Sequence, residues 1–138
     1  MHNETMRRVL EWALSDGVSA ARRLTTGVPA GYLEELVVEL GLSGEELREV
    51  FGMSRATWSR RRRRGTLSLR EGELVYRVAR LYGMALMAFG GDGEKAREWM
   101  RRPHPELNRE RPLLSARLEP TAREAEAVLI RALAGVPV

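Results

Sequence analysis

The sequence predicts an all-α protein. Apolar residues recur every three or four positions through most of its 138 residues, which is the spacing of one face of a helix. The one β-branched cluster, in "VVEL", lies inside such a pattern, so no strand is expected. Serine followed three positions later by glutamate occurs twice ahead of apolar runs, a pairing that marks helix starts.

The first part of the chain is expected to hold five helices. Their approximate ranges are 4–15, a short helix within 15–27, 30–40, 44–51 and 55–64. Ser43 and Glu46 predict a capping box at the start of the fourth helix. Gly52 suits the tight turn that follows, because glycine tolerates a positive φ.

A long helix over 69–89 is expected to begin at a second capping box, Ser68 with Glu71. The run "GGDG" at residues 90–93 is the best domain boundary, which divides the chain into domains 1–89 and 90–138. After it we expect a short helix over 94–102 and a loop rich in proline and charge. A last helix from near Pro120 to Gly135 is expected to turn the following residues inward: Ala122, Ala125, Val128, Leu129, Ala132 and Leu133.

Positive charge is concentrated in one block. Residues 48–80 hold ten arginines and three glutamates, a net of 10 − 3 = +7, whereas the whole chain carries +4. The remainder therefore carries 4 − 7 = −3. A basic block in an otherwise slightly acidic chain favours a surface that binds a polyanion. The arginine-rich, glutamine-free composition fits either a GC-rich genome or growth at high temperature.

Two short helices joined at Gly52 have the layout of a helix-turn-helix unit, whose second helix reads the DNA major groove. The residues expected to pack the pair are Leu47, Val50 or Phe51, Met53 and Trp58. Residues expected near base edges are Ser54, Arg55, Ala56, Thr57, Ser59 and Arg60. Those expected near phosphates are Arg61, Arg62, Arg63 and Arg64. A solvated charged face and a clamp on an acidic protein patch are the competing interpretations of the arginine run.

An enzyme is not expected. The chain has no cysteine, and its two histidines, His2 and His104, form no metal pair or catalytic dyad. The glutamate pairs Glu71 with Glu73 and Glu34 with Glu35 are interpreted as ordinary surface charges. We expect no cofactor and no metal. No apolar stretch reaches the length of a membrane span and no signal peptide is recognisable, so a cytoplasmic protein is expected.

The segment "FGMSRATWSRRRRRGTLSLREGELVYRVARLYGMALMAFG" resembles the helix-turn-helix half of the Xre/MbcA/ParS antitoxin family. The residues that carry this resemblance are Thr57, Trp58, Ser59, Arg60, Arg61, Leu67, Ser68, Glu71, Arg77, Ala79, Arg80 and Leu81. The following part is similar to that family's toxin-binding domain, at Phe89, Gly90, Ala96, Trp99, Met100, Pro103, Leu107, Pro112, Leu113 and Gly135. The resemblance covers about residues 27–138. "LNRE" stands where the family usually has leucine-glycine-glycine.

The resemblance implies an antitoxin that inhibits a RES-domain toxin, an enzyme that degrades NAD, and that binds double-stranded operator DNA to repress its own operon. A homodimer or a larger complex with the toxin is expected, with no membrane partner. The candidate toxin-binding residues are Pro103, His104, Pro105, Leu107, Arg131, Gly135, Val136, Pro137 and Val138. Of these, Pro103, His104, Pro105, Leu107 and the tail 136–138 are expected to be exposed.

Core packing is the competing interpretation for the apolar residues of this part, and we favour it for Phe89, Trp99, Met100 and Leu113. The alternative function is a stand-alone repressor whose C-terminal domain only dimerises. Residues 1–89 are expected to bind DNA without the rest.

Overall fold

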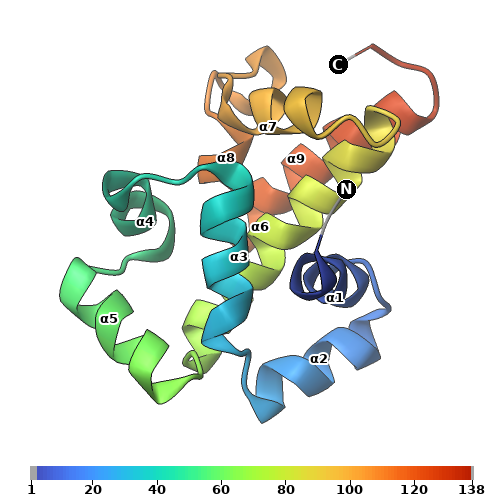
Figure 1. Cartoon of the computed structure of the whole chain (residues 1–138). Helices are drawn as coiled ribbons and strands as arrows, with labels where there is room; N and C mark the ends of the chain where they lie inside the picture. The colour runs from blue at the N-terminus through green and yellow to red at the C-terminus, as the bar shows by residue number, and fades with distance from the viewer. Residues whose placement is uncertain (1–2, 138) are drawn as a thin grey trace.

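The computed structural model describes residues 3–137, and in that range helices are joined by turns and loops, with one isolated bridge between Pro29 and Thr66 and no strand (Figure 1). This confirms the all-α prediction. The elements are α1 Glu4–Ala13, α2 Gly17–Thr26, α3 Ala30–Leu40, α4 Gly44–Phe51, α5 Arg55–Arg64, α6 Leu69–Ala88, α7 Gly93–Arg101, the 3-10 turn η1 Pro105–Leu107, α8 Pro112–Ser115 and α9 Glu119–Leu133.

Local capping sets the boundaries of the helices in the first part, as predicted. The Ser43 hydroxyl accepts from the Glu46 N–H at 3.1 Å, and the Glu46 carboxylate accepts from the Ser43 N–H at 3.1 Å. Ser68 and Glu71 form the same reciprocal pair at the start of α6. α4 ends at Gly52, whose φ of 65° lies in the left-handed region that favours glycine.

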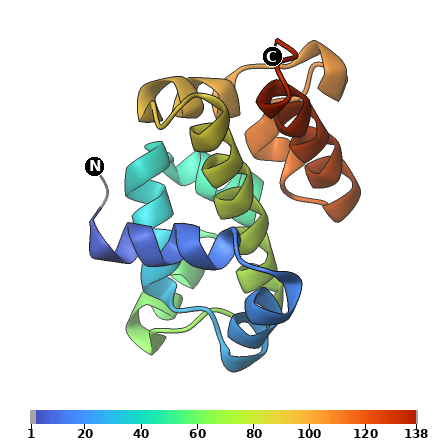
Figure 2. The ribbon, with the colours of Figure 1, turned by 90° about the vertical axis from the view of Figure 1, so that its right-hand side faces the viewer.

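The long helix α6 is the central element of the molecule. Figure 2 shows α1 and α3 on one side of α6 and α9 on the other. Most positions of α6 are buried, among them Val75, Val78 and Leu81. A Cβ atom at Gly72 would lie 2.8 Å from Val28 Cγ2, so glycine there lets the segment before α3 approach closely.

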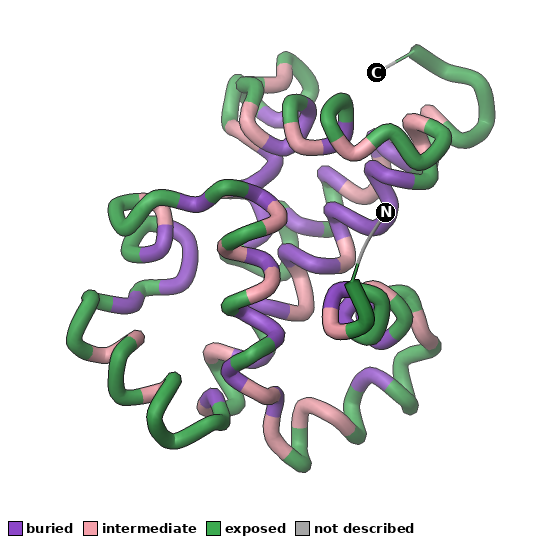
Figure 3. Tube along the Cα trace, in the orientation of Figure 1, coloured by how far each residue is buried: buried purple, intermediate pink, exposed green. Residues whose placement is uncertain are grey.

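One hydrophobic cluster runs through both parts of the chain, as the buried segments in Figure 3 show. It contains Leu47 and Met53 from the helix pair as well as Trp99 and Leu129 from the C-terminal part. Residues 90–91 form a turn at the predicted boundary. The division into domains 1–89 and 90–138 stays a prediction.

The structure differs from the prediction within residues 103–118 and at the end of α9. The expected loop contains η1 and α8, both with proline in the first turn, where its missing N–H breaks no helical hydrogen bond. The expectation that Leu133 faces inward is wrong, because its side chain is 48% exposed. The last buried residue of α9 is Leu129, so the final turn projects beyond the packed part of the helix.

Candidate nucleic-acid and partner-protein surfaces

The helix pair α4–α5 has the predicted helix-turn-helix geometry at one edge of the molecule (Figure 1). Of the packing residues expected around the turn, Leu47 and Met53 are buried, and so are both of the alternatives, Val50 and Phe51. Trp58 is half-buried and packs against this core, which agrees with its interpretation as an anchor. The sequence-predicted packing of the pair is therefore confirmed.

The start of α5 presents most of the predicted groove residues to solvent. Ser54, Arg55, Ala56, Ser59 and Arg60 are exposed. Thr57 is half-buried, and its hydroxyl accepts from the Arg60 guanidinium at 3.2 Å. The Ser54 hydroxyl accepts from the Thr57 N–H at 3.1 Å and so caps the helix. Arg60 is thereby steadied on the outer face of α5.

The arginine run divides into residues that hold α5 in place and residues that stay available. Arg61 Nε donates to both carboxylate oxygens of Glu71, at 2.8 and 3.1 Å. Arg62 donates to Glu34 at 2.8 Å, and its guanidinium lies 5.6 Å from the centre of the Trp58 ring. Within the described residues Arg55 and Arg63 make no ion pair, so both are free to meet a polyanion.

Arg64 and Glu71 complete the polar contacts of α5. The Arg64 guanidinium donates to the Thr66 carbonyl at 3.2 Å while its side chain stays exposed. The expectation that Glu71 is an ordinary surface charge is wrong, because its side chain is 12% exposed. Burial alone would raise the pKa of Glu71, but the bonds from Arg61 and from the Ser68 N–H outweigh burial and lower it. Glu71 is thus an ionised anchor for the arginine helix.

The predicted partner-binding residues are not all accessible. Pro103 and Pro105 are exposed, and His104 is half-buried with its ring 6.2 Å from that of Trp99. The expectation that Leu107 is exposed is wrong: it is 6% exposed and belongs to the hydrophobic cluster. Leu107 lies in η1, which contacts α9, and this packing buries its side chain.

The loop after η1 contains two non-glycine residues in the left-handed conformation that glycine usually adopts. Asn108 has a φ of 54° and Arg109 a φ of 63°, so two consecutive residues lie in the left-handed region. These two residues of "LNRE" stand where the family that the sequence resembles usually has two glycines. Asparagine adopts this region at modest cost, whereas arginine does so less readily. The loop therefore carries local backbone strain at Arg109.

The end of α9 and the tail expose three apolar residues, Ile130, Leu133 and Val136. Val136 is 47% exposed and Pro137 is also exposed, as expected, and Gly135 begins the tail. Arg131 is exposed and its guanidinium lies 2.5 Å from the Glu106 carboxylate. Val138 lies outside the described residues. The sequence did not predict Ile130 as a candidate binding residue, although a spacing of three residues puts Ile130 and Leu133 on the same face of a helix.

The expected core residues of this part are Trp99, Met100 and Leu113, and all three are buried. Phe89 is half-buried and packs against the same cluster. Among residues 3–137, no group of histidine and carboxylate side chains is arranged to hold a metal ion. No helix in that range is long and apolar enough to cross a membrane.

Two family models together match most of the chain. Residues 19–80 match the antitoxin Xre-like helix-turn-helix domain, and residues 84–135 match the antitoxin Xre/MbcA/ParS C-terminal toxin-binding domain. The chain belongs to the Xre/MbcA/ParS family of antitoxins. No curated protein matches the chain.

Membership in this antitoxin family gives each surface a partner class. The arginine helix α5 lies in the DNA-binding domain, and residues 103–107 and all of α9 lie in the toxin-binding domain, whose match ends at Gly135. The antitoxin therefore has DNA and a toxin protein as its partner classes, and both matched domains are binding domains. The two matches meet inside α6, and α1 precedes the first match although it packs against α3 and α6.

Proposed function

We propose that this antitoxin inhibits a RES-domain toxin that degrades NAD and represses its own operon by binding operator DNA. The match of residues 84–135 to the toxin-binding domain carries this proposal, because a stand-alone repressor has no need of such a domain. A RES-type toxin is the partner class implied by the resemblance of residues 27–138. The reaction belongs to the toxin, and the antitoxin contributes binding alone. It works in the cytoplasm, as a homodimer or in a larger complex with the toxin.

The DNA contact is proposed for the outer face of α5. Arg55 and Arg60 face the major groove, where arginine donates two hydrogen bonds to guanine. Ser54, Ala56, Thr57 and Ser59 line the same groove, and Arg63 and Arg64 contact phosphates. Arg61 and Arg62 are held by carboxylates, so they contribute mainly by fixing the orientation of α5.

Toxin inhibition is proposed to occur by occlusion, through the segment 103–107 and the tail 135–138. Pro103 and Pro105 are exposed, and so are the apolar residues Ile130 and Leu133 at the end of α9 and Val136 in the tail. The tail and α5 lie on opposite sides of the view in Figure 1. This separation leaves room for DNA and toxin on the same antitoxin molecule.

The test is co-expression of the antitoxin with the toxin-sized protein encoded beside it, followed by pull-down and an NAD-hydrolysis assay. The expected result is a stable complex without NAD hydrolysis, and recovery of hydrolysis when the toxin is freed. Binding of the antitoxin to the DNA upstream of its own coding sequence is measured in parallel. DNA binding without any toxin complex would instead support a stand-alone repressor.

A further inference from the structure

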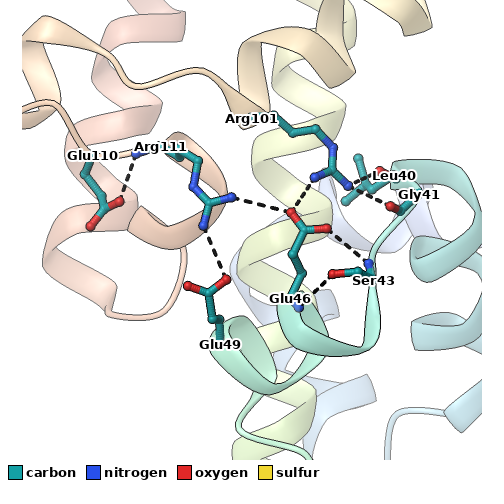
Figure 4. Close-up of polar contacts among 8 residues, drawn as sticks. All are labelled: Leu40, Gly41, Ser43, Glu46, Glu49, Arg101, Glu110 and Arg111. Atoms are coloured by element: carbon teal, nitrogen blue, oxygen red, sulfur yellow. Dashed lines mark hydrogen bonds and ion pairs between the residues drawn. The ribbon is translucent and has the colours of Figure 1, made fainter.

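The first helix of the DNA-binding pair is held by the toxin-binding part of the chain. Glu46, in the first turn of α4, accepts hydrogen bonds from two arginines that follow it by 55 and 65 residues (Figure 4). Arg101, the last residue of α7, bonds to Glu46 Oε2. Arg111, just before α8, lies 3.5 Å from the same oxygen. One carboxylate thus joins α4 to two C-terminal elements.

The two arginines have further contacts that fix this junction. Arg101 Nη2 donates to the main-chain carbonyls of Leu40 and Gly41, at 2.5 and 2.9 Å, where α3 ends. Arg111 Nη2 lies 3.5 Å from Glu49 on the next turn of α4. One guanidinium therefore spans the α3–α4 junction, and the other runs along α4.

These contacts lie partly out of water, where a charge pair is less screened. The Glu46 side chain is 13% exposed, and those of Arg101 and Arg111 are 33% and 25% exposed. Burial would raise the pKa of Glu46, but the bonds from Arg101 and the Ser43 N–H, helped by Arg111, lower it. Glu46 is therefore ionised at neutral pH, and the junction holds two carboxylates against two guanidinium groups.

Met53 in the turn between the two helices is buried in the same cluster as Val50 of α4, and Trp58 of α5 packs against that cluster. The orientation of α5 therefore depends on α4 as well as on the ion pairs of the arginine run. A helix-turn-helix pair reads a specific sequence only when its second helix enters the groove at the right angle. We propose that Glu46, with Arg101 and Arg111, is a positioning residue that makes sequence-specific DNA binding depend on the toxin-binding part. This inference rests on the DNA binding proposed above.

The test compares two substitutions of neighbouring glutamates in the full chain. In Glu46→Gln, the side-chain oxygen still accepts from the Ser43 N–H, because glutamine also forms capping boxes, but the charge that holds the arginines is lost. Glu45→Gln removes the same charge from an exposed neighbour that makes no ion pair in the described residues. Both variants remove one negative charge, which by itself strengthens binding to a polyanion.

The readout is fluorescence anisotropy with two labelled duplexes, one from the DNA upstream of the coding sequence and one of random sequence. Glu46→Gln is expected to weaken binding to the upstream duplex about fivefold or more, within the usual range of coupling between sites. Binding to the random duplex stays within about twofold, since it depends on phosphate contacts. Glu45→Gln binds both duplexes as tightly as the unchanged chain or more tightly.

Equal upstream binding by Glu46→Gln and Glu45→Gln would overturn the positioning role. An equal loss of both duplexes would also overturn it, because that pattern indicates general destabilisation rather than a misplaced α5. Circular dichroism checks the folding of each variant. If Glu46→Gln does not fold, Arg111→Gln replaces it as the test, with Arg102→Gln as its control. Arg102 is exposed at the end of α7, and its ion pair within residues 3–137 is a local one with Glu98.

The double variant Glu46→Gln with Arg111→Gln adds a test of connectivity. If both residues act through one junction, the double variant loses no more upstream affinity than Glu46→Gln alone. Additive losses would contradict a shared junction. If the unchanged chain binds neither duplex, the proposed DNA function itself fails. If the unchanged chain binds the upstream duplex and Glu46→Gln binds it equally well, only the positioning role of Glu46 is overturned.

Discussion

The helix-turn-helix part and the toxin-binding part of this antitoxin are built by different means. In the first, α4, α5 and α6 each begin at a serine cap and are separated by glycine turns. In the second, α7 begins at an Asp92 cap, but α8 and α9 have no side-chain cap, and one turn places Arg109 at a positive φ. The DNA-binding part thus specifies its shape locally, whereas the toxin-binding part depends on packing against α6.

The largest effect is expected where local capping and ion pairing coincide. Glu71→Ala removes one half of a capping box and the partner of Arg61, and we expect it to lower the free energy of unfolding by about 2–4 kcal/mol. Urea denaturation measures the change. Glu124→Ala, an exposed site on α9 without an ion pair in the described residues, serves as the control and should change stability by less than about 0.5 kcal/mol. Similar losses of free energy of unfolding at both sites would contradict the view that caps and ion pairs stabilise the first part.

The next effect concerns DNA recognition by the free arginines. Arg55→Ala and Arg60→Ala should each weaken binding to the upstream duplex by about 1–3 kcal/mol and relax sequence preference. Arg63→Ala should weaken upstream and random duplexes alike and reduce the salt dependence of binding. Anisotropy titrations at several salt concentrations measure both quantities. Equal losses on both duplexes for Arg55→Ala would remove that residue from the groove.

One substitution in a turn of each part, at two residues with positive φ, tests the comparison directly. Arg109→Gly should raise the free energy of unfolding by about 0.5–1 kcal/mol, because glycine relieves the left-handed strain but loses more chain entropy. Gly41→Ala, at a φ of 62°, should lower it by about 1 kcal/mol. Thermal melting shows whether each variant is more or less stable than the unchanged chain. A destabilising Arg109→Gly would show that the arginine side chain itself supports the loop.

Acid should remove part of the stability that both capping boxes provide. The pKa values of Glu46 and Glu71 lie below their ordinary value of 4.5, so the ionised carboxylates stabilise the fold fully above that pH. This contribution is lost as the pH falls from about 4.5 through the lowered values, so the free energy of unfolding should decline over that acidic range. The double variant Glu46→Gln with Glu71→Gln should decline less steeply. Asp16, whose pKa is also lowered, by its bonds from Ser19, supplies some of the remaining slope.

The smallest effect on the fold is expected at the tail. Deletion of residues 135–138 should leave melting temperature and DNA affinity unchanged, because Gly135, Val136 and Pro137 are exposed. Toxin inhibition should be lost, since two valines flank a proline that stiffens the segment before docking. NAD hydrolysis by the co-purified complex is the measurement. Full inhibition by the shortened chain would shift the contact to residues 103–107.

The sequence predicted best those features that depend on neighbours in the chain. Both capping boxes and the turn at Gly52 follow from residues within a few positions, and the structure has all of them. The paired state of Glu71 was missed because Arg61 lies ten positions away on another helix. Leu107 was misplaced for the same reason, since its burial depends on packing against α9. The junction at Glu46 joins residues 55 and 65 positions apart, which no local pattern reveals.

The position of α6 between the two parts also has a consequence for the growing chain. α1 to α5 are synthesised before α6, so one side of it can be covered as soon as it forms. α9, which covers the other side, follows only after residues 89–118 have been added. During that interval a long apolar helix surface is open to chaperones and proteases. Each new molecule of this antitoxin therefore passes through a stage at which the cell's quality control competes with its own folding.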